Sequence, residues 1–379
     1  CHKPWQNLTI NHFSMKSVLV FLFAFLHVLA SFSQEHEKPL KVAVIGLTHT
    51  HVHWLLGSKN ADVEIVGIVE PNRDLAERYT AQHGFSMALV SSNIDEMLQK
   101  ASPEAVTAFG TTFEHLQVVE KFAPLGIHVM VEKPLAVNME HALKMKGLAK
   151  RHKIHLLTNY ETTWYASNAM AKKLADEGAL GELNKIVVHD GHQGPKEIGV
   201  NKEFLDWLTD PIENGGGAIT DFGCYGVNLS TWLMNGERPI SVTALTQQLK
   251  PHIYPKVDDD ATIIVQYPKT QAILMASWNW PFNRKDMEVY GTTGYLFSDN
   301  KSDVRIRLKN DETYKNETLG EPPVPFNNPF SYFAAVVKNQ ISPEASDLSA
   351  LENNILVVEI LDAARESAKT GKTIYLKKD

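Results

Sequence analysis

Three histidines at alternate positions follow a short apolar run at residues 42–45. The segment KVAVIGLTHTHVHWLL, residues 41–56, places His49, His51 and His53 where a strand gives way to a helix. Imidazole nitrogens bind metal ions or donate hydrogen bonds to phosphate groups. One interpretation is therefore a metal-dependent hydrolase with ligands at strand ends, and the other is a modified nucleotide site.

The same segment carries part of a dinucleotide-binding turn. Gly46 keeps the first glycine of the G-x-G-x-x-G pattern, whereas Thr48 and His51 replace the second and third. Glu70 ends the next apolar run, where an acidic side chain binds the ribose hydroxyls of NAD and repels the 2′-phosphate of NADP. We therefore expect NAD, with NADP as the alternative, to contact Gly46, Leu47, Thr48, His49, His51 and Glu70.

A metal site would need further ligands at later strand ends. Those ends offer only His115, and Glu132 beside a lysine. Neutral imidazoles without a cluster of carboxylates form an incomplete ligand set. We therefore assign no metal ligands from the sequence. His49 and His51 are expected to line the phosphate turn, and His53 to be an exposed residue of the helix that follows.

Short apolar runs alternate with helical patterns up to about residue 160. Buried parallel strands are predicted at 41–46, 63–70, 104–110, 127–133 and 154–158, with helices at 72–84, 113–126 and 138–152. This alternation is typical of an α/β fold in which helices cover both faces of a doubly wound parallel sheet. We assign residues 34–160 to a nucleotide-binding Rossmann domain.

The pattern changes in the second half of the chain. Strands with period-two alternation are predicted at 184–192, 239–249, 261–268, 271–280, 286–299 and 303–309, with helices near 164–177, 328–340 and 345–369. Such strands predict an α/β domain with an open, mostly antiparallel sheet. We assign residues 161–379 to this substrate domain, whose uncovered sheet face favours a homo-oligomer.

The beginning of the chain has the layout of a secretory leader. Residues 15–33 contain a basic residue, an apolar run and small residues, whereas residues 1–14 resemble untranslated upstream sequence. An uncleaved membrane anchor is the alternative. After cleavage about 345 residues remain, with the single cysteine Cys224, so export does not serve disulfide formation.

The net charge of −7 without a basic stripe argues against nucleic-acid binding. We expect a periplasmic protein that does not bind the membrane after cleavage.

The segment VMVEKPLAVNMEHA, residues 129–142, carries the strongest resemblance to a known family. A strand, Glu132-Lys133-Pro134 and a helix resemble the Gfo/Idh/MocA family of nicotinamide-dependent sugar oxidoreductases. Similar motifs stand at 111–134, 177–183, 214–236 and 289–296, so the resemblance covers essentially the whole chain after the leader. It implies that Thr111, His115, Glu132 and Lys133 also contact the dinucleotide.

The resemblance also places the catalytic residues. Oxidation of a secondary alcohol needs a hydride acceptor and a proton acceptor. Lys133 is the expected catalytic residue, provided that burial or the cofactor lowers its pKa. Tyr225 stands where most members have histidine, and we expect the neighbouring ammonium to lower its pKa. Asp221 is expected to orient either group or to cap the next helix.

Tyrosine at position 225 resembles the glucose–fructose oxidoreductase and dihydrodiol dehydrogenase branches of the family. Glucose–fructose oxidoreductase is exported and holds its nucleotide tightly. The resemblance therefore implies a tightly bound cofactor. Trp164 and His192 are further candidates for the substrate pocket, beside Lys133, Asp221 and Tyr225. We predict an exported NAD(P)-dependent enzyme that oxidises or reduces a secondary hydroxyl of a sugar or glycoside.

Three alternatives stay open at this point. An NAD-dependent glycosidase would use transient oxidation and elimination. A metal-dependent hydrolase would use His49, His51 and His53. The third alternative is a sugar-binding protein without catalytic activity, in which the glycines of the dinucleotide turn have been lost.

Overall fold

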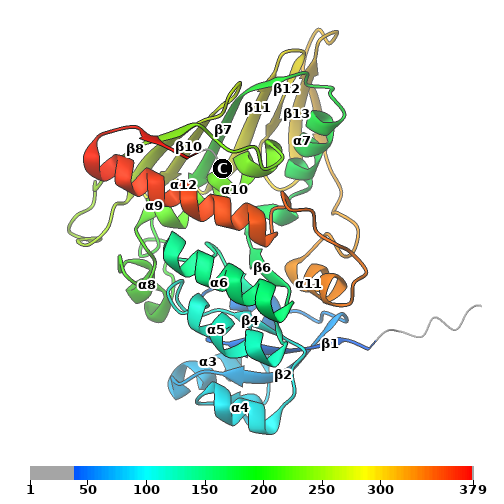
Figure 1. The fold of residues 1–379 in the computed structure, drawn as a ribbon, viewed down its shortest axis with the longest axis vertical. Helices are drawn as coiled ribbons and strands as arrows, with labels where there is room; N and C mark the ends of the chain where they lie inside the picture. Colours follow the sequence, from blue (N-terminus) through cyan, green and yellow to red (C-terminus); the bar gives the residue numbers. More distant parts are fainter. Residues whose placement is uncertain (1–37, 378–379) are drawn as a thin grey trace, which may run out of the picture. The chain divides into compact units, whose positions relative to one another are not determined.

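The computed structural model describes residues 38–377, which form two β-sheets with their covering helices (Figure 1). The predicted leader at residues 15–33 lies outside the described residues. Within residues 38–377, no helix is long and apolar enough to cross a membrane.

The first sheet has six parallel strands in the order β3-β2-β1-β4-β5-β6. These strands are Val90–Ser91, Val63–Val69, Leu40–Ile45, Ala105–Ala108, His128–Glu132 and Leu156–Asn159. The helices and short 3₁₀ turns between them are α2 (Val52–Leu56), α3 (Arg73–His83), η1 (Met87–Leu89), α4 (Ile94–Lys100), α5 (His115–Phe122), η2 (Ala123–Leu125) and α6 (Met139–His152). This is the predicted doubly wound arrangement.

Local sequence signals explain where these elements begin and end. β4 and β5 are buried on both faces, which is why their sequences are almost continuously apolar. α3 begins after Asn72, whose side chain accepts a hydrogen bond from the Leu75 amide. It ends at Gly84, which adopts the left-handed conformation that favours glycine.

The second sheet has nine strands in the order β14-β13-β12-β11-β7-β10-β9-β8-β15. They are Lys315–Thr318, Asp303–Leu308, Gly294–Ser298, Arg284–Gly291, Leu183–Gly191, Gln271–Ser277, Asp260–Gln266, Ser241–Gln247 and Ile374–Tyr375. Only β7 and β10 pair in parallel, so the sheet is mostly antiparallel, as predicted. The run predicted as one strand at 286–299 is a hairpin of β11 and β12.

The remaining helices and the short 3₁₀ turn η3 follow β6 in the chain. They are η3 (Glu161–Trp164), α7 (Ala166–Asp176), α8 (Lys202–Leu208), α9 (Ala218–Asp221), α10 (Gly223–Leu233), α11 (Pro329–Val337) and α12 (Leu351–Thr370). α12 contacts β8 and α10 of the second sheet and α6 of the first (Figure 1).

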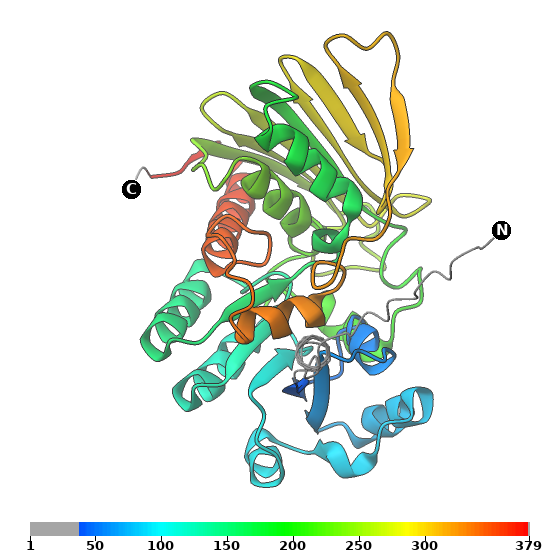
Figure 2. The same cartoon turned by 90° about the vertical axis from the view of Figure 1, so that its right-hand side faces the viewer.

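Late in the chain, α11 packs against the first sheet (Figure 2). Phe333 and Val336 of α11 pack in one apolar cluster with Leu40 and Val42 of β1. The segment after residue 160 therefore completes the core of the nucleotide-binding sheet as well as forming the second sheet. The division at residues 34–160 and 161–379 stays a prediction.

Candidate active site

The carboxyl ends of the first sheet's strands face a cavity of about 440 Å³. β5 leads into Lys133, and the loop after β1 supplies His49 and His51. The second half of the chain adds residues from β7, α9, α10 and β11. The lining includes His49, Thr50, His51, Lys133, Glu161, Tyr165, His192, Asp221, Phe222, Tyr225 and Lys285. The three predicted catalytic residues thus lie in one cavity.

Lys133 and Asp221 form a buried ion pair. The Lys133 Nζ lies 2.5 Å from Asp221 Oδ1, and the Trp278 indole N–H donates to Asp221 Oδ2 at 3.0 Å. Burial opposes both charges, but the attraction between them outweighs it, so the pKa of Lys133 is raised and the pKa of Asp221 is lowered. Lys133 is therefore an ammonium at neutral pH, and the lowered pKa expected from the sequence is wrong for this state of the protein.

Asp221 does not cap the helix that follows it. It ends α9, and Phe222 precedes α10 without any side-chain capping hydrogen bond. The predicted capping role is wrong because the carboxylate is already bound to Lys133 and Trp278. The predicted orienting role is compatible with this geometry.

Tyr225 lies in the first turn of α10 with its ring between two ammonium groups. The ring centroid is 5.1 Å from the Nζ of Lys133 and 5.0 Å from that of Lys285. Burial, followed by nearby carboxylates such as Glu161, raises the pKa of the phenol well above its usual value. The predicted lowering is wrong because burial dominates. The phenol is therefore a hydrogen-bond donor at neutral pH.

The two predicted pocket residues lie in different places. His192 lines the catalytic cavity, and its Nδ1 accepts a hydrogen bond from the Gly194 amide at 2.9 Å. Its neutral ring therefore carries the proton on Nε2, because burial lowers the pKa of His192 to about 4. Trp164 lines an adjoining cavity of about 570 Å³, where its indole N–H donates to Asn159 at 3.1 Å. The expectation that Trp164 lines the catalytic cavity is wrong.

Three charged residues of the cavity region were not singled out from the sequence. Lys285 pairs with Glu161, and Tyr165 donates a hydrogen bond to the same carboxylate at 2.6 Å. Burial opposes ionisation of Glu161, but Lys285 overcomes it and lowers the pKa to about 2. Asp190 is buried, and neither of its oxygens has a hydrogen-bond partner among the described residues. No spacing links these residues, because they come from η3, β7 and β11.

The turn after β1 passes very close to the end of β4. Gly46 has a φ of +78°, and a Cβ at this position would lie 2.8 Å from the Gly110 nitrogen. Only glycine fits both the backbone conformation and the space. The Thr48 hydroxyl donates to the Phe109 carbonyl at 3.3 Å and accepts from the Trp207 indole at 3.1 Å. Thr48 thus ties the turn to β4 and α8.

Glu70 holds the turn from the end of β2. Its two carboxylate oxygens accept hydrogen bonds from the amides of Leu47 at 2.9 Å and Asn72 at 2.8 Å. Burial raises the pKa of Glu70, and the two amide hydrogen bonds oppose that rise. A contact with ribose hydroxyls, which stays a prediction, would add to this anchoring role. Leu47 itself is buried in the adjacent apolar cluster.

A further cavity, of about 420 Å³, is lined by Gly46 at the start of the turn, whereas His49 and His51 at its end line the catalytic cavity. His115 lines it and is buried, with its Nδ1 3.2 Å from the Leu135 carbonyl. Thr111 accepts a hydrogen bond from the Glu114 amide at the start of α5. The turn therefore lines two cavities at once, as an extended ligand lying across it would require.

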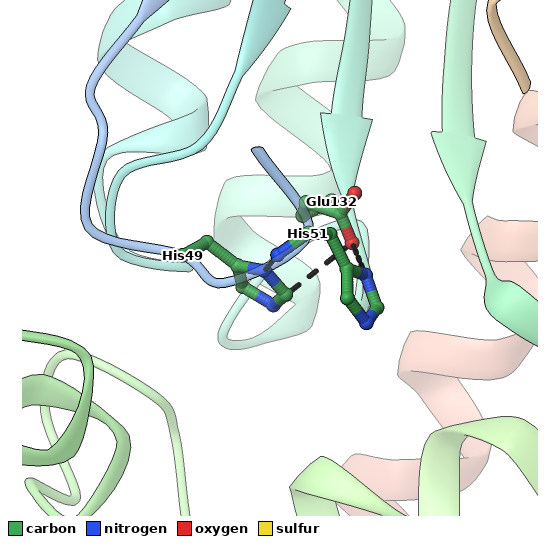
Figure 3. Close-up of side chains that lie close together, drawn as sticks. All are labelled: His49, His51 and Glu132. Atoms are coloured by element: carbon green, nitrogen blue, oxygen red, sulfur yellow. Dashed lines mark hydrogen bonds and ion pairs between the residues drawn. The ribbon is translucent and has the colours of Figure 1, made fainter. Parts of the chain in front are cut away.

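His49, His51 and Glu132 form a cluster at the edge of the catalytic cavity (Figure 3). The His51 Nδ1 is 2.9 Å and the His49 Nε2 is 3.9 Å from Glu132 Oε2. Burial lowers the pKa of both imidazoles well below the usual value. His53 is not part of the cluster, because its Nδ1 lies 2.8 Å from His83 Nε2 on α3. The group of three histidines considered for a hydrolase is therefore not formed.

Two family models match the chain. Residues 40–160 match the oxidoreductase family with an NAD-binding Rossmann fold, and residues 168–297 match the GFO/IDH/MocA C-terminal domain. The chain belongs to the Gfo/Idh/MocA oxidoreductase family. Among curated relatives, it is 23% identical to inositol 2-dehydrogenase of Rhizobium meliloti over 86% of this chain and 95% of that protein. It is 24% identical to D-xylose 1-dehydrogenase [NADP(+)] of Haloarcula marismortui over 90% and 94% of the two chains.

Two solved structures share the fold. Aldose-aldose oxidoreductase from Caulobacter crescentus has a TM-score of 0.75 at 20% identity, covering 89% of this chain and 100% of that chain. An inositol dehydrogenase homolog from Azotobacter vinelandii, complexed with NAD+, has a TM-score of 0.76 at 15% identity, covering 90% and 98%.

A Gfo/Idh/MocA Rossmann domain implies a nicotinamide dinucleotide, and the residues present fit one. Gly46 leaves the space that a side chain would fill, and the cavities lined by Gly46 and by His51 provide room for the two ends of the ligand. The second and third glycines are replaced by Thr48 within the turn and by His51 at the start of α2. There, Thr48 and His51 would lie beside the phosphates.

Proposed function

We propose that this protein is an exported, NAD(H)-dependent oxidoreductase that acts on a secondary hydroxyl of a sugar, polyol or glycoside. The observation that carries the proposal is the Lys133–Asp221 pair, which lies at the carboxyl end of β5 in the catalytic cavity. Ligands of open α/β sheets bind at this edge. Its family and the names of its curated relatives support a sugar or polyol as the substrate.

The chain's own residues provide the proton chemistry. A bound nicotinamide supplies the hydride acceptor or donor. In the reducing direction, the ammonium of Lys133 donates a proton to the carbonyl oxygen and stabilises its developing charge. In the oxidising direction, Lys133 must first lose a proton to solvent, and the resulting amine then accepts the hydroxyl proton. Asp221 fixes the position of Nζ, and the Trp278 indole fixes Asp221.

The other groups of the cavity suit a polyhydroxylated substrate. His192 offers an N–H donor, the Tyr225 phenol is protonated, and the Glu161–Lys285 pair offers both an acceptor and a donor. Because these groups can each donate or accept hydrogen bonds, we propose that recognition depends on hydroxyl groups. We propose NAD(H) rather than NADP(H), because Glu70 would repel a 2′-phosphate.

Location and assembly belong to the same proposal. The pattern of residues 15–33 supports export to the periplasm. Free NAD is scarce there, which supports a tightly held cofactor. Leu245 of β8 and Met275 of β10 are exposed on the second sheet, which supports a homo-oligomer formed through this sheet.

A single-turnover assay tests the proposed reaction. The mature protein, loaded with NAD+ and mixed with aldoses, polyols and aryl glycosides, should form reduced nicotinamide with at least one of them. Lys133→Met should abolish the signal, whereas Lys144→Met, on the exposed side of α6, should retain it. Glycoside cleavage with no net reduced nicotinamide would instead favour the redox-neutral glycosidase. Absence of any reaction from a nucleotide-loaded protein would contradict the proposal.

A further inference from the structure

The cluster of His49, His51 and Glu132 has the composition of a metal site. One candidate ligand atom from each residue lies within 4.8 Å of the other two, although the residues come from the β1–α2 loop and the end of β5. Two imidazoles and one carboxylate suit divalent transition metals such as Zn²⁺. From the sequence, Glu132 and the histidines formed an incomplete ligand set, whereas the fold brings these three side chains together.

One nitrogen of the cluster is left without a partner. The Nε2 of His49 is buried and makes no hydrogen bond to any described residue. Its distance of 3.9 Å from Glu132 Oε2 is too long for a hydrogen bond. Buried polar atoms are usually satisfied. The His49 and His51 rings lie beside the Glu132 carboxylate (Figure 3), so an ion between these side chains would satisfy Nε2.

The distances suit an ion after small movements. Metal–ligand bonds of about 2.1 Å in a tetrahedral site place ligand atoms roughly 3.4 Å apart. The observed separations, 2.9 Å from His51 Nδ1 and 3.9 Å from His49 Nε2 to Glu132 Oε2, lie on either side of that value. Binding through Nε2 moves the ring proton of His49 to Nδ1 and gives up the hydrogen bond from the His51 amide. One neutral hydrogen bond is a small loss beside three metal–ligand bonds.

The surrounding residues hold the three side chains in place. Asn159 donates to Glu132 Oε1 at 2.7 Å, which leaves Oε2 directed at the histidines. His51 stacks on Trp54 with ring centroids 3.8 Å apart, and His49 packs against Phe204. Such supporting contacts are typical of metal sites, where they fix the orientation of each ligand.

We propose that His49, His51 and Glu132 bind a divalent transition-metal ion at the edge of the catalytic cavity. Three protein ligands leave at least one coordination position open, as in catalytic rather than structural zinc sites. His49 and His51 both line the cavity that contains Lys133, so the open position faces the substrate space. The ion would take an oxygen ligand there, namely a hydroxyl or carbonyl group of the bound substrate.

Metal titration of nucleotide-free, chelator-treated protein tests this site. One equivalent of Co²⁺ should produce the visible absorption of a low-symmetry complex, and one equivalent of Zn²⁺ should displace it. His51→Ala and Glu132→Gln should each weaken binding at least about tenfold, in line with loss of a ligand or of its orientation. Because no nucleotide or substrate is present, this result is independent of the proposed hydride transfer.

His53→Ala provides the matched control. His53 lies two residues from His51 but pairs with His83, so this variant should bind the metal as the unmodified protein does. Thermal melting without metal should show that all variants are folded. The proposal is overturned if the unmodified protein binds no ion, if His51→Ala and Glu132→Gln bind as tightly as it does, or if His53→Ala loses binding equally.

Discussion

The Nζ of Lys133 and the Oδ1 of Asp221 lie 2.5 Å apart, although the residues are 88 positions apart in the sequence. The first follows β5 of the nucleotide-binding sheet, and the second ends α9 under the second sheet. Their contact therefore joins the two halves of the molecule at the point where chemistry is proposed.

Asp221→Asn should reduce both activity and stability. The change leaves the buried ammonium of Lys133 facing a neutral amide, and breaking a buried pair in this way costs about 3 kcal/mol. We expect kcat to fall by about 10²-fold or more, because the proton donor is no longer fixed. Steady-state kinetics and urea unfolding measure the two effects. Glu140→Gln, in the exposed pair with Lys144, should change neither.

Tyr225→Phe should separate the contribution of the Tyr225 hydroxyl group from that of its aromatic ring. Phenylalanine keeps the ring faces that contact Lys133 and Lys285, so the variant should fold normally. Because the phenol is protonated, its removal takes away one hydrogen-bond donor, and kcat should fall only about tenfold or less. A loss as large as that of Lys133→Met would show instead that Tyr225 transfers the proton.

Gly46→Ala should damage the turn far more than a comparable change elsewhere. Gly84 has nearly the same positive φ, +76°, but no atom lies within 4 Å of an added Cβ there. Gly84→Ala should therefore cost about 1 kcal/mol of stability from backbone strain alone. Gly46→Ala should cost about 1–3 kcal/mol more, because its Cβ meets Gly110. Equal losses from unfolding measurements would contradict the close approach.

Much of the fold follows from simple sequence patterns. β4 and β5 are almost continuously apolar because both of their faces are buried. β9 and β10 alternate because only one face is buried. β14 escaped prediction because all four of its residues are exposed and carry no alternation. β3 and β15 have two residues each, too few for any period.

The candidate site was only partly predictable. Motif positions predicted Lys133, Asp221 and Tyr225 as site residues. No spacing in the sequence predicts that the Trp278 indole holds Asp221. The alternation of His49, His51 and His53 suggested one group of three. α2 begins at Val52, however, and the helical rotation carries His53 toward α3.

The pH dependence of stability should reflect His115. Burial lowers the pKa of His115 to about 4, whereas the unfolded chain binds its proton near 6.5. The unfolded state therefore gains protons first as the pH falls, so the contribution of His115 is complete above about pH 6.5 and is lost toward pH 4. This contribution is up to about 3 kcal/mol.

His115→Gln should flatten the pH profile of unfolding between pH 7 and about pH 4. Glutamine keeps a donor for the Leu135 carbonyl but binds no proton in this range. His252→Gln, at an exposed position, serves as the control and should leave the slope unchanged. An unaltered slope in His115→Gln would show that its burial does not govern the profile.

The most direct test of the proposed function asks whether the altered turn still holds a dinucleotide. The mature protein would be purified without added nucleotide and denatured, and the released small molecules would be identified by mass spectrometry. Our account predicts close to one NAD(H) per chain, retained by the turn at Gly46 and its two cavities. A protein that releases no dinucleotide and binds none when titrated with NAD+ or NADH would contradict it.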